Sequence, residues 1–242
     1  MKIAQNIILI ITIFASLFLS ATAAEKLLEP TMSITIGGIT SPQVALTLDA
    51  CSGKIDKRIL KVLIDNKIHA TIFITGRWIK SNPKTIKIFN QHKNLFQLEN
   101  HGASHIPAVL GSERPYGIKP AGTPTALLKE VNNGNLAIQL ISKTKPQWFR
   151  GATALYSPAA IDLIKQTNHR IAGFSLNADF GASASANTAA SRVASAKDGD
   201  VIIAHINQPT RAAGAGIAKG ILALQAKGFR FVRLDEVEVT KE

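Results

Sequence analysis

The chain has 242 residues, 46% of them apolar, and its 28 Lys and Arg residues outnumber 16 Asp and Glu residues to give a formal charge of +12. This length and apolar content indicate a folded domain with a sizeable core, and they exclude a chain that is disordered throughout. The single cysteine, Cys51, excludes an internal disulfide.

Residues 1–24 have the pattern of a secretory signal peptide. Lys2 precedes an apolar run over residues 7–19, and small residues at 21–24 offer a cleavage site. The run is short for a membrane span, although an uncleaved anchor is the alternative. We therefore expect a periplasmic or secreted protein with no stable membrane span after cleavage. Its basic charge favours association with anionic envelope polymers, and nucleic acid is not expected as a partner of an exported chain.

Strands and helices alternate after a lead-in segment over residues 25–43. The strands are expected at residues 44–49, 70–75, 95–98, 147–150, 170–176, 201–204 and 229–234. Helical periodicity or a cap followed by Pro predicts helices at residues 56–66, 82–92, 123–142, 157–166 and 214–227, the third with a break at 132–135. Such alternation implies parallel strands joined by right-handed crossovers. Residues 44–242 are thus predicted to form a single domain, a distorted (β/α) barrel of about seven parallel strands, with an open doubly wound sheet as the alternative.

Ionisable residues follow most of these strands. They are Asp49, His101, His105, Arg150, Asp179 and His205. The carboxyl ends of barrel strands face the active site, so we expect these side chains to gather there. His101 and His105 are four residues apart, which in a helical turn places both imidazoles on one side, an arrangement suited to a divalent transition metal.

Five segments in this order resemble the polysaccharide deacetylases of carbohydrate esterase family 4. They are Thr47–Ala50, His101–His105, Phe149–Ala152, Asp179 with Phe180, and Val201–His205. The first stands where the family has Thr-Phe-Asp-Asp, and the second matches its His-(Ser/Thr)-x-x-His segment with Gly102 at the hydroxyl position. The resemblance covers residues 44–234, nearly all of the chain after the lead-in segment.

The resemblance implies that His101 and His105 hold a divalent metal, zinc or a similar ion. The third ligand of the family is an aspartate, and this chain has Ala50 at that position. Catalytic zinc normally has three protein ligands. Either Asp49 binds the metal directly or Cys51 replaces the carboxylate, and the sequence leaves both open.

The resemblance also implies acid–base roles. Asp49 would be the general base, and His205 would be the general acid that protonates the departing amine. Arg150 would keep Asp49 ionised, and Asp179 would orient His205 and raise its pKa. Backbone N–H groups after Arg150 are expected to help hold the oxyanion.

The implied function is metal-dependent removal of N-acetyl groups from an envelope or extracellular glycan, of the peptidoglycan or poly-N-acetylglucosamine type. The alternative is a glycan-binding protein on the same scaffold that has lost metal and activity. We expect Trp148 and Tyr156 to contact sugar rings, with core packing as the alternative for each; Trp78 and Tyr116 are further candidates for the same role.

Overall fold

The computed structural model describes residues 26–35 and 41–240, so the predicted signal peptide lies outside the described residues. Eight strands alternate with helices along this part of the chain. The strands are β1 (Gln43–Ala50), β2 (Ala70–Ile74), β3 (Phe96–Asn100), β4 (Trp148–Phe149), β5 (Arg170–Ile171), β6 (Leu176–Asn177), β7 (Val201–His205) and β8 (Arg230–Val232). The predicted alternation of strands and helices is confirmed.

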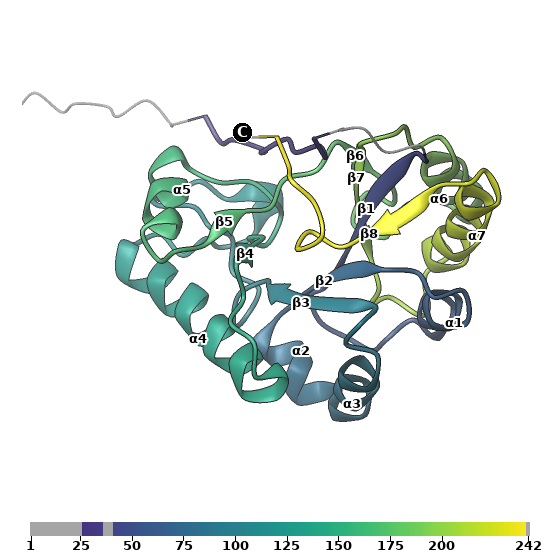
Figure 1. Cartoon of the computed structure of the whole chain (residues 1–242). Coiled ribbons are helices and arrows are strands. Elements are labelled where there is room, and N and C mark those ends of the chain that lie inside the picture. The colour runs from purple at the N-terminus through teal and green to yellow at the C-terminus, as the bar shows by residue number, and fades with distance from the viewer. Residues whose placement is uncertain (1–25, 36–40, 241–242) are drawn as a thin grey trace, which may run out of the picture.

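All strand pairs are parallel, in the order β5-β4-β3-β2-β1-β7-β6, and β8 pairs with the first residues of β1. The sheet curls on itself, and the helices surround its outer face (Figure 1). The prediction of a single-domain, distorted (β/α) barrel is confirmed. Of the helices in the described part of the chain, none has the length and apolar character needed to cross a bilayer.

The side chains of β1 point alternately into two hydrophobic cores, one on each face of the sheet. Leu46, Leu48 and Ala50 are fully buried in the cluster between the sheet and the helices. Ala45 belongs to a second cluster on the inner face, and Thr47 and Asp49 alternate with the outward residues. Because successive side chains of a strand point to opposite faces, Asp49 is directed into the barrel and Ala50 away from it.

The predicted strand at residues 170–176 is two strands. β5 pairs with β4 and β6 pairs with β7, so the barrel is open between β5 and β6. The lead-in segment covers this opening: the Phe174 N–H donates to the Pro30 carbonyl at 3.3 Å, and Met32 and Ile34 are buried in the inner cluster. A Cβ on Gly173 would meet the Pro30 carbonyl carbon at 2.7 Å, so only glycine allows this close approach.

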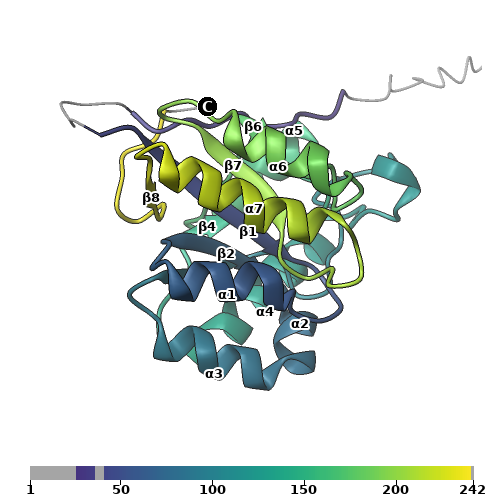
Figure 2. The same cartoon turned by 90° about the vertical axis from the view of Figure 1, so that its right-hand side faces the viewer.

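The helices are α1 (Lys57–Asp65), α2 (Gly76–Ser81), α3 (Pro83–Gln91), α4 (Pro124–Ser142), α5 (Pro158–Lys165), α6 (Ala186–Ala194) and α7 (Ala213–Ala226). Pro lies in the first turn of α3, α4 and α5, as the sequence indicated. α7 packs between α6 and α1 (Figure 2). The expected break in α4 does not occur, because Gly134 fits against the chain that follows β3 and the helix continues to Ser142.

Candidate functional site

The six ionisable residues that follow the predicted strands meet at the carboxyl ends of the strands. Asp49, His101, His105 and His205 line a cavity of about 610 Å³. Arg150 and Asp179 are fully buried, and each binds one of the residues in that lining. Cys51 lines the same cavity.

Arg150 and Asp49 form a buried ion pair. Arg150 Nη1 donates to Asp49 Oδ1 at 2.9 Å and to Thr47 Oγ1 at 2.9 Å. Its Nη2 donates to the Gly173 carbonyl at 3.0 Å, and the guanidinium lies over the Phe73 ring. Burial alone would raise the pKa of Asp49, but the charge of Arg150, with smaller contributions from histidines, outweighs it and lowers that pKa. Asp49 is therefore a carboxylate that faces the cavity.

His205 is oriented by Asp179. Asp179 Oδ1 accepts from His205 Nδ1 at 3.0 Å, and its Oδ2 accepts from the His205 backbone N–H at 2.7 Å. Burial alone would lower the pKa of His205, but the hydrogen bond and charge of Asp179, together with Cys51, raise it well above its usual value. The site thus combines a carboxylate whose pKa is lowered with an imidazole whose pKa is raised.

His101, His105 and Cys51 form a cluster of metal-binding side chains. Cys51 Sγ lies 3.4 Å from His101 Nε2, and the donor atoms of all three residues lie within 4.8 Å of one another. His101 Nδ1 donates to the Arg150 carbonyl at 2.7 Å, which leaves Nε2 free to bind on the side of Cys51. Burial would raise the pKa of the Cys51 thiol, but the charge of His101 and hydrogen bonds from His101, His105 and His205 hold it well below its usual value.

The end of β1 explains why Cys51, and not residue 50, faces the cavity. Ala50 is the last residue of the strand and is fully buried in the outer core. The Cys51 carbonyl accepts from Thr75 Oγ1 at 2.7 Å and from Arg77 Nε at 3.3 Å, which fixes the turn after the strand. The thiol therefore points to the same side as Asp49.

Helix α4 holds the loop that carries both histidines, a role that the sequence did not reveal. The buried Glu130 accepts from the backbone N–H of Ser104 at 2.8 Å and of Ile106 at 3.1 Å, on either side of His105. A Cβ on Gly134 would lie 2.7 Å from the Gly102 carbonyl carbon, so glycine allows the helix to touch the loop. Within this loop His105 itself has a left-handed φ of 64°.

Trp148 and Tyr156 are buried in the core and are not among the residues that line this cavity. The ring of Trp148 stacks with the Arg170 guanidinium at 3.9 Å. Tyr156 Oη accepts from the Gly151 N–H at 2.7 Å, so this N–H, which directly follows Arg150, is already bonded within the protein. The Gly151 N–H is therefore not free to hold an oxyanion.

Three exposed apolar side chains surround the mouth of the cavity instead. Tyr116, Ile118 and Phe180 are 76%, 40% and 49% exposed, and all three line it. The Arg192 guanidinium lies 4.6 Å from the centre of the Phe180 ring and supports it from one side. Ile118 and Phe180 lie outside the helices and strands, so strand and helix patterns did not identify them as candidates.

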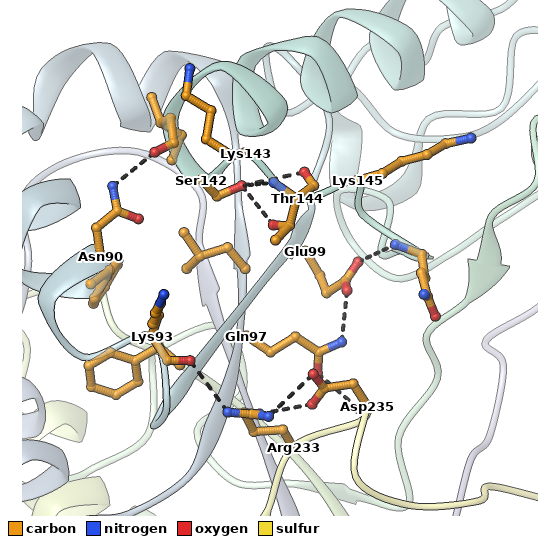
Figure 3. A pocket seen from close by; sticks show the side chains of 15 residues that line it. Asn90, Lys93, Gln97, Glu99, Ser142, Lys143, Thr144, Lys145, Arg233 and Asp235 are labelled. Atoms are coloured by element: carbon orange, nitrogen blue, oxygen red, sulfur yellow. Dashed lines mark hydrogen bonds and ion pairs between the residues drawn. The ribbon is translucent and has the colours of Figure 1, made fainter.

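A second cavity, of about 490 Å³, lies beside β3 and the end of α4 (Figure 3). Its charged and polar groups bind one another: Glu99 accepts from Gln97, and Arg233 donates to Asp235. Burial raises the pKa of Glu99 to about 7. Its lining contains neither the histidines nor Cys51, so the chemistry belongs to the first cavity.

The fold and the strand-end constellation define a (β/α)-barrel hydrolase site, and the sequence comparison agrees. Residues 38–172 match the family described as polysaccharide deacetylase, more than half of the chain. The chain therefore belongs to the polysaccharide deacetylase family, and the predicted enzyme class is confirmed at the level of the family. Comparison with curated proteins gives no match.

Solved structures of the same fold include several carbohydrate esterase family 4 proteins. A peptidoglycan deacetylase from Bacillus subtilis has 23% identity and a TM-score of 0.65, with 81% of this chain and 90% of that chain covered. An acetyl xylan esterase from Clostridium thermocellum in complex with a cobalt ion has 25% identity and a TM-score of 0.65, with 80% and 89% covered. A family pseudoenzyme from Bacillus anthracis has 17% identity and a TM-score of 0.64, with 82% of this chain and 66% of that chain covered.

The contact between Glu130 and the loop that carries His101 and His105 can be tested by mutation. Glu130→Ala removes the acceptor of two backbone N–H groups and should lower the free energy of unfolding by about 1–3 kcal/mol. Glu130→Gln keeps an acceptor oxygen and should retain most of that stability. Urea denaturation of both variants measures the difference, and a Glu130→Ala protein as stable as the wild type would contradict the role assigned to Glu130.

Proposed function

We propose that the protein removes acetyl groups from an N-acetylated glycan of the cell envelope, of the peptidoglycan or poly-N-acetylglucosamine type. The observation that carries the proposal is that two groups lining one cavity have buried partners of opposite charge. Arg150 pairs with Asp49 and lowers its pKa, and Asp179 pairs with His205 and raises its pKa. A pair of groups whose environments push their pKa values apart suits one to act as base and the other as acid.

The donor set of the cavity fits a divalent metal. His101 and His105 would hold it, and the hydrogen bond from His101 Nδ1 to the Arg150 carbonyl is the kind of support that metal-binding imidazoles have. When bound, such an ion lowers the pKa of water and polarises an acyl oxygen. Imidazole ligands suit zinc as well as copper, iron and nickel, and we propose zinc.

Asp49 and His205 each carry out one of the two proton transfers. Asp49 takes the proton of the attacking water, and the Arg150 guanidinium keeps the carboxylate in position. His205 gives its proton to the amide nitrogen as the C–N bond breaks, so that acetate and a free amine leave. Asp179 holds the imidazole by Nδ1, which directs Nε2 toward the reacting atoms.

The rim of the cavity supports a sugar substrate. Tyr116 and Phe180 offer exposed aromatic faces, and Ile118 adds an apolar edge. Rigid aromatic surfaces beside a few polar groups are typical of small-ligand sites. The signal-peptide pattern of residues 1–24 supports a reaction in the periplasm or outside the cell, where the strongly basic charge of the chain would favour anionic envelope polymers.

Glycan binding without catalysis is the second candidate function. Ala50 favours it, because the carboxylate expected there from the family resemblance is absent. Incubation of N-acetylglucosamine oligomers and of peptidoglycan with the zinc-loaded protein separates the two. Release of acetate supports the deacetylase, whereas binding of the glycan with no acetate released supports the second candidate.

The Asp179–His205 pair predicts a change in pH dependence. His205 must be protonated to act as the acid, and Asp179 raises its pKa. Asp179→Asn should lower that pKa, so the alkaline limb of the kcat/KM profile should move to lower pH. His205→Ala should lower kcat by about 10²–10⁴-fold and should remove this limb.

Asp162→Asn on the exposed face of α5 is the matched control and should leave the profile unchanged. The pH dependence of acetate release measures all three variants. An alkaline limb that stays in place in Asp179→Asn would remove His205 from the role of acid.

The exposed Tyr116 ring at the rim of the cavity leads to a separate prediction about glycan binding. If the Tyr116 ring contacts a sugar, Tyr116→Ala should raise KM for a glycan oligomer about two- to tenfold, as expected for the loss of about 0.5–1.5 kcal/mol of ring contact. The kcat should change little, because the ring touches no reacting atom. Tyr116→Phe should behave like the wild type, and Leu136→Ala, at an exposed position on α4, is a control; a KM unchanged in Tyr116→Ala would exclude the contact.

A further inference from the structure

Compared with the polysaccharide deacetylase pattern, the proposed metal site of this chain lacks one carboxylate ligand, because residue 50 is alanine. The structure offers one side chain that can replace it. Ala50 is fully buried in the outer core, where its Cβ lies among apolar side chains such as Leu48 and Ile74. A carboxylate at position 50 would therefore enter that core and not the cavity. Ala50→Asp would therefore not complete the metal site.

Asp49 is already engaged. Its Oδ1 accepts from Arg150 at 2.9 Å, and its Oδ2 lies 3.8 Å from His101 Nε2. The buried guanidinium of Arg150 would lose its only carboxylate among the described residues if Asp49 turned toward a metal. A buried charge deprived of its partner is strongly destabilising. Asp49 therefore fits the role of base better than that of ligand.

The Cys51 thiol has the position that a third ligand requires. Metal–sulfur and metal–nitrogen bonds of about 2.3 and 2.0–2.1 Å at a tetrahedral angle separate the two donor atoms by about 3.5 Å. Cys51 Sγ lies 3.4 Å from His101 Nε2, and His105 completes a cluster with all donor atoms within 4.8 Å. The turn that presents the thiol is fixed through the Cys51 carbonyl by Thr75 and Arg77.

We infer that Cys51 binds the metal as a thiolate, so that the centre is of the Cys-His-His type. This inference rests on the proposed function for the presence of a metal and goes beyond it in the identity of the third ligand. A thiolate carries the same single negative charge as the missing carboxylate, so the net charge of the loaded site is preserved. It is a softer ligand, however, and selects zinc, cobalt or cadmium over magnesium and manganese.

Cobalt(II) is the probe that tests this ligand directly. Titration of cobalt chloride into the purified, metal-free protein should produce a thiolate-to-cobalt charge-transfer absorption in the near ultraviolet together with visible bands of a low-coordinate ion. Cys51→Ser should lose the charge-transfer band. Zinc competition should show a loss of affinity in this variant of more than about 100-fold, beyond the 10–100-fold typical of residues that only support a ligand.

Two further variants keep the test decisive. Cys51→Asp restores a charged ligand without sulfur, so it should bind cobalt more tightly than Cys51→Ser and still lack the charge-transfer band. Asp49→Asn should keep the band, because Asp49 is not a ligand. Circular dichroism of each variant verifies that it is folded.

Cobalt binding by the wild type without a charge-transfer band, or equal zinc affinity in wild type and Cys51→Ser, would overturn the inference. So would a wild type that binds no cobalt. The proposed function fails separately: a protein that shows the band but releases no acetate from glycan would have the Cys-His-His centre without the deacetylase activity.

Discussion

The buried ion pair between Arg150 and Asp49 is the interaction on which the site depends. Burial of a guanidinium is tolerated only when its N–H groups have hydrogen-bond acceptors. The acceptors of the fully buried Arg150 are Asp49, Thr47 and the carbonyls of Ala172 and Gly173. The last two lie where the barrel opens between β5 and β6. The Arg150 side chain therefore fixes the Asp49 carboxylate and the open edge of the barrel together, and loss of the charge of Arg150 or of Asp49 would cost about 3–5 kcal/mol.

Arg150 also contacts the cluster of His101, His105 and Cys51 through its backbone. The Arg150 carbonyl accepts from His101 Nδ1, and this hydrogen bond sets which nitrogen faces Cys51. Across the cavity, the pair of Asp179 and His205 is the counterpart of Arg150 and Asp49, with a buried charge of opposite sign beside the group that lines the cavity. The two buried partners thus lower the pKa of Asp49 and raise the pKa of His205, as the proposed roles of base and acid require.

The sequence predicted the barrel and the gathering of ionisable groups because continuous apolar strands and their terminal residues are local patterns. It did not predict the opening of the barrel, which depends on the contact of Gly173 with Pro30, some 140 residues away along the chain. Nor did it decide between Asp49 and Cys51 as ligand, because the direction of Cys51 is set by a turn bonded to the start of α2. The sequence also did not show which aromatic rings are exposed, because the buried rings of Trp148 and Tyr156 and the exposed ring of Tyr116 are not distinguished by local patterns.

In the proposed function, Asp49 acts as a base on an acetylated glycan, and Arg150 keeps the Asp49 carboxylate ionised. Acetate release from peptidoglycan by the zinc-loaded wild type and by Asp49→Asn tests this most directly, with metal content measured in both proteins. We expect acetate from the wild type, release at least about 100-fold slower from Asp49→Asn, as for loss of a general base, and equal metal content in the two proteins. Equal rates in the two proteins, or no acetate from a wild type that binds both zinc and glycan, would contradict it.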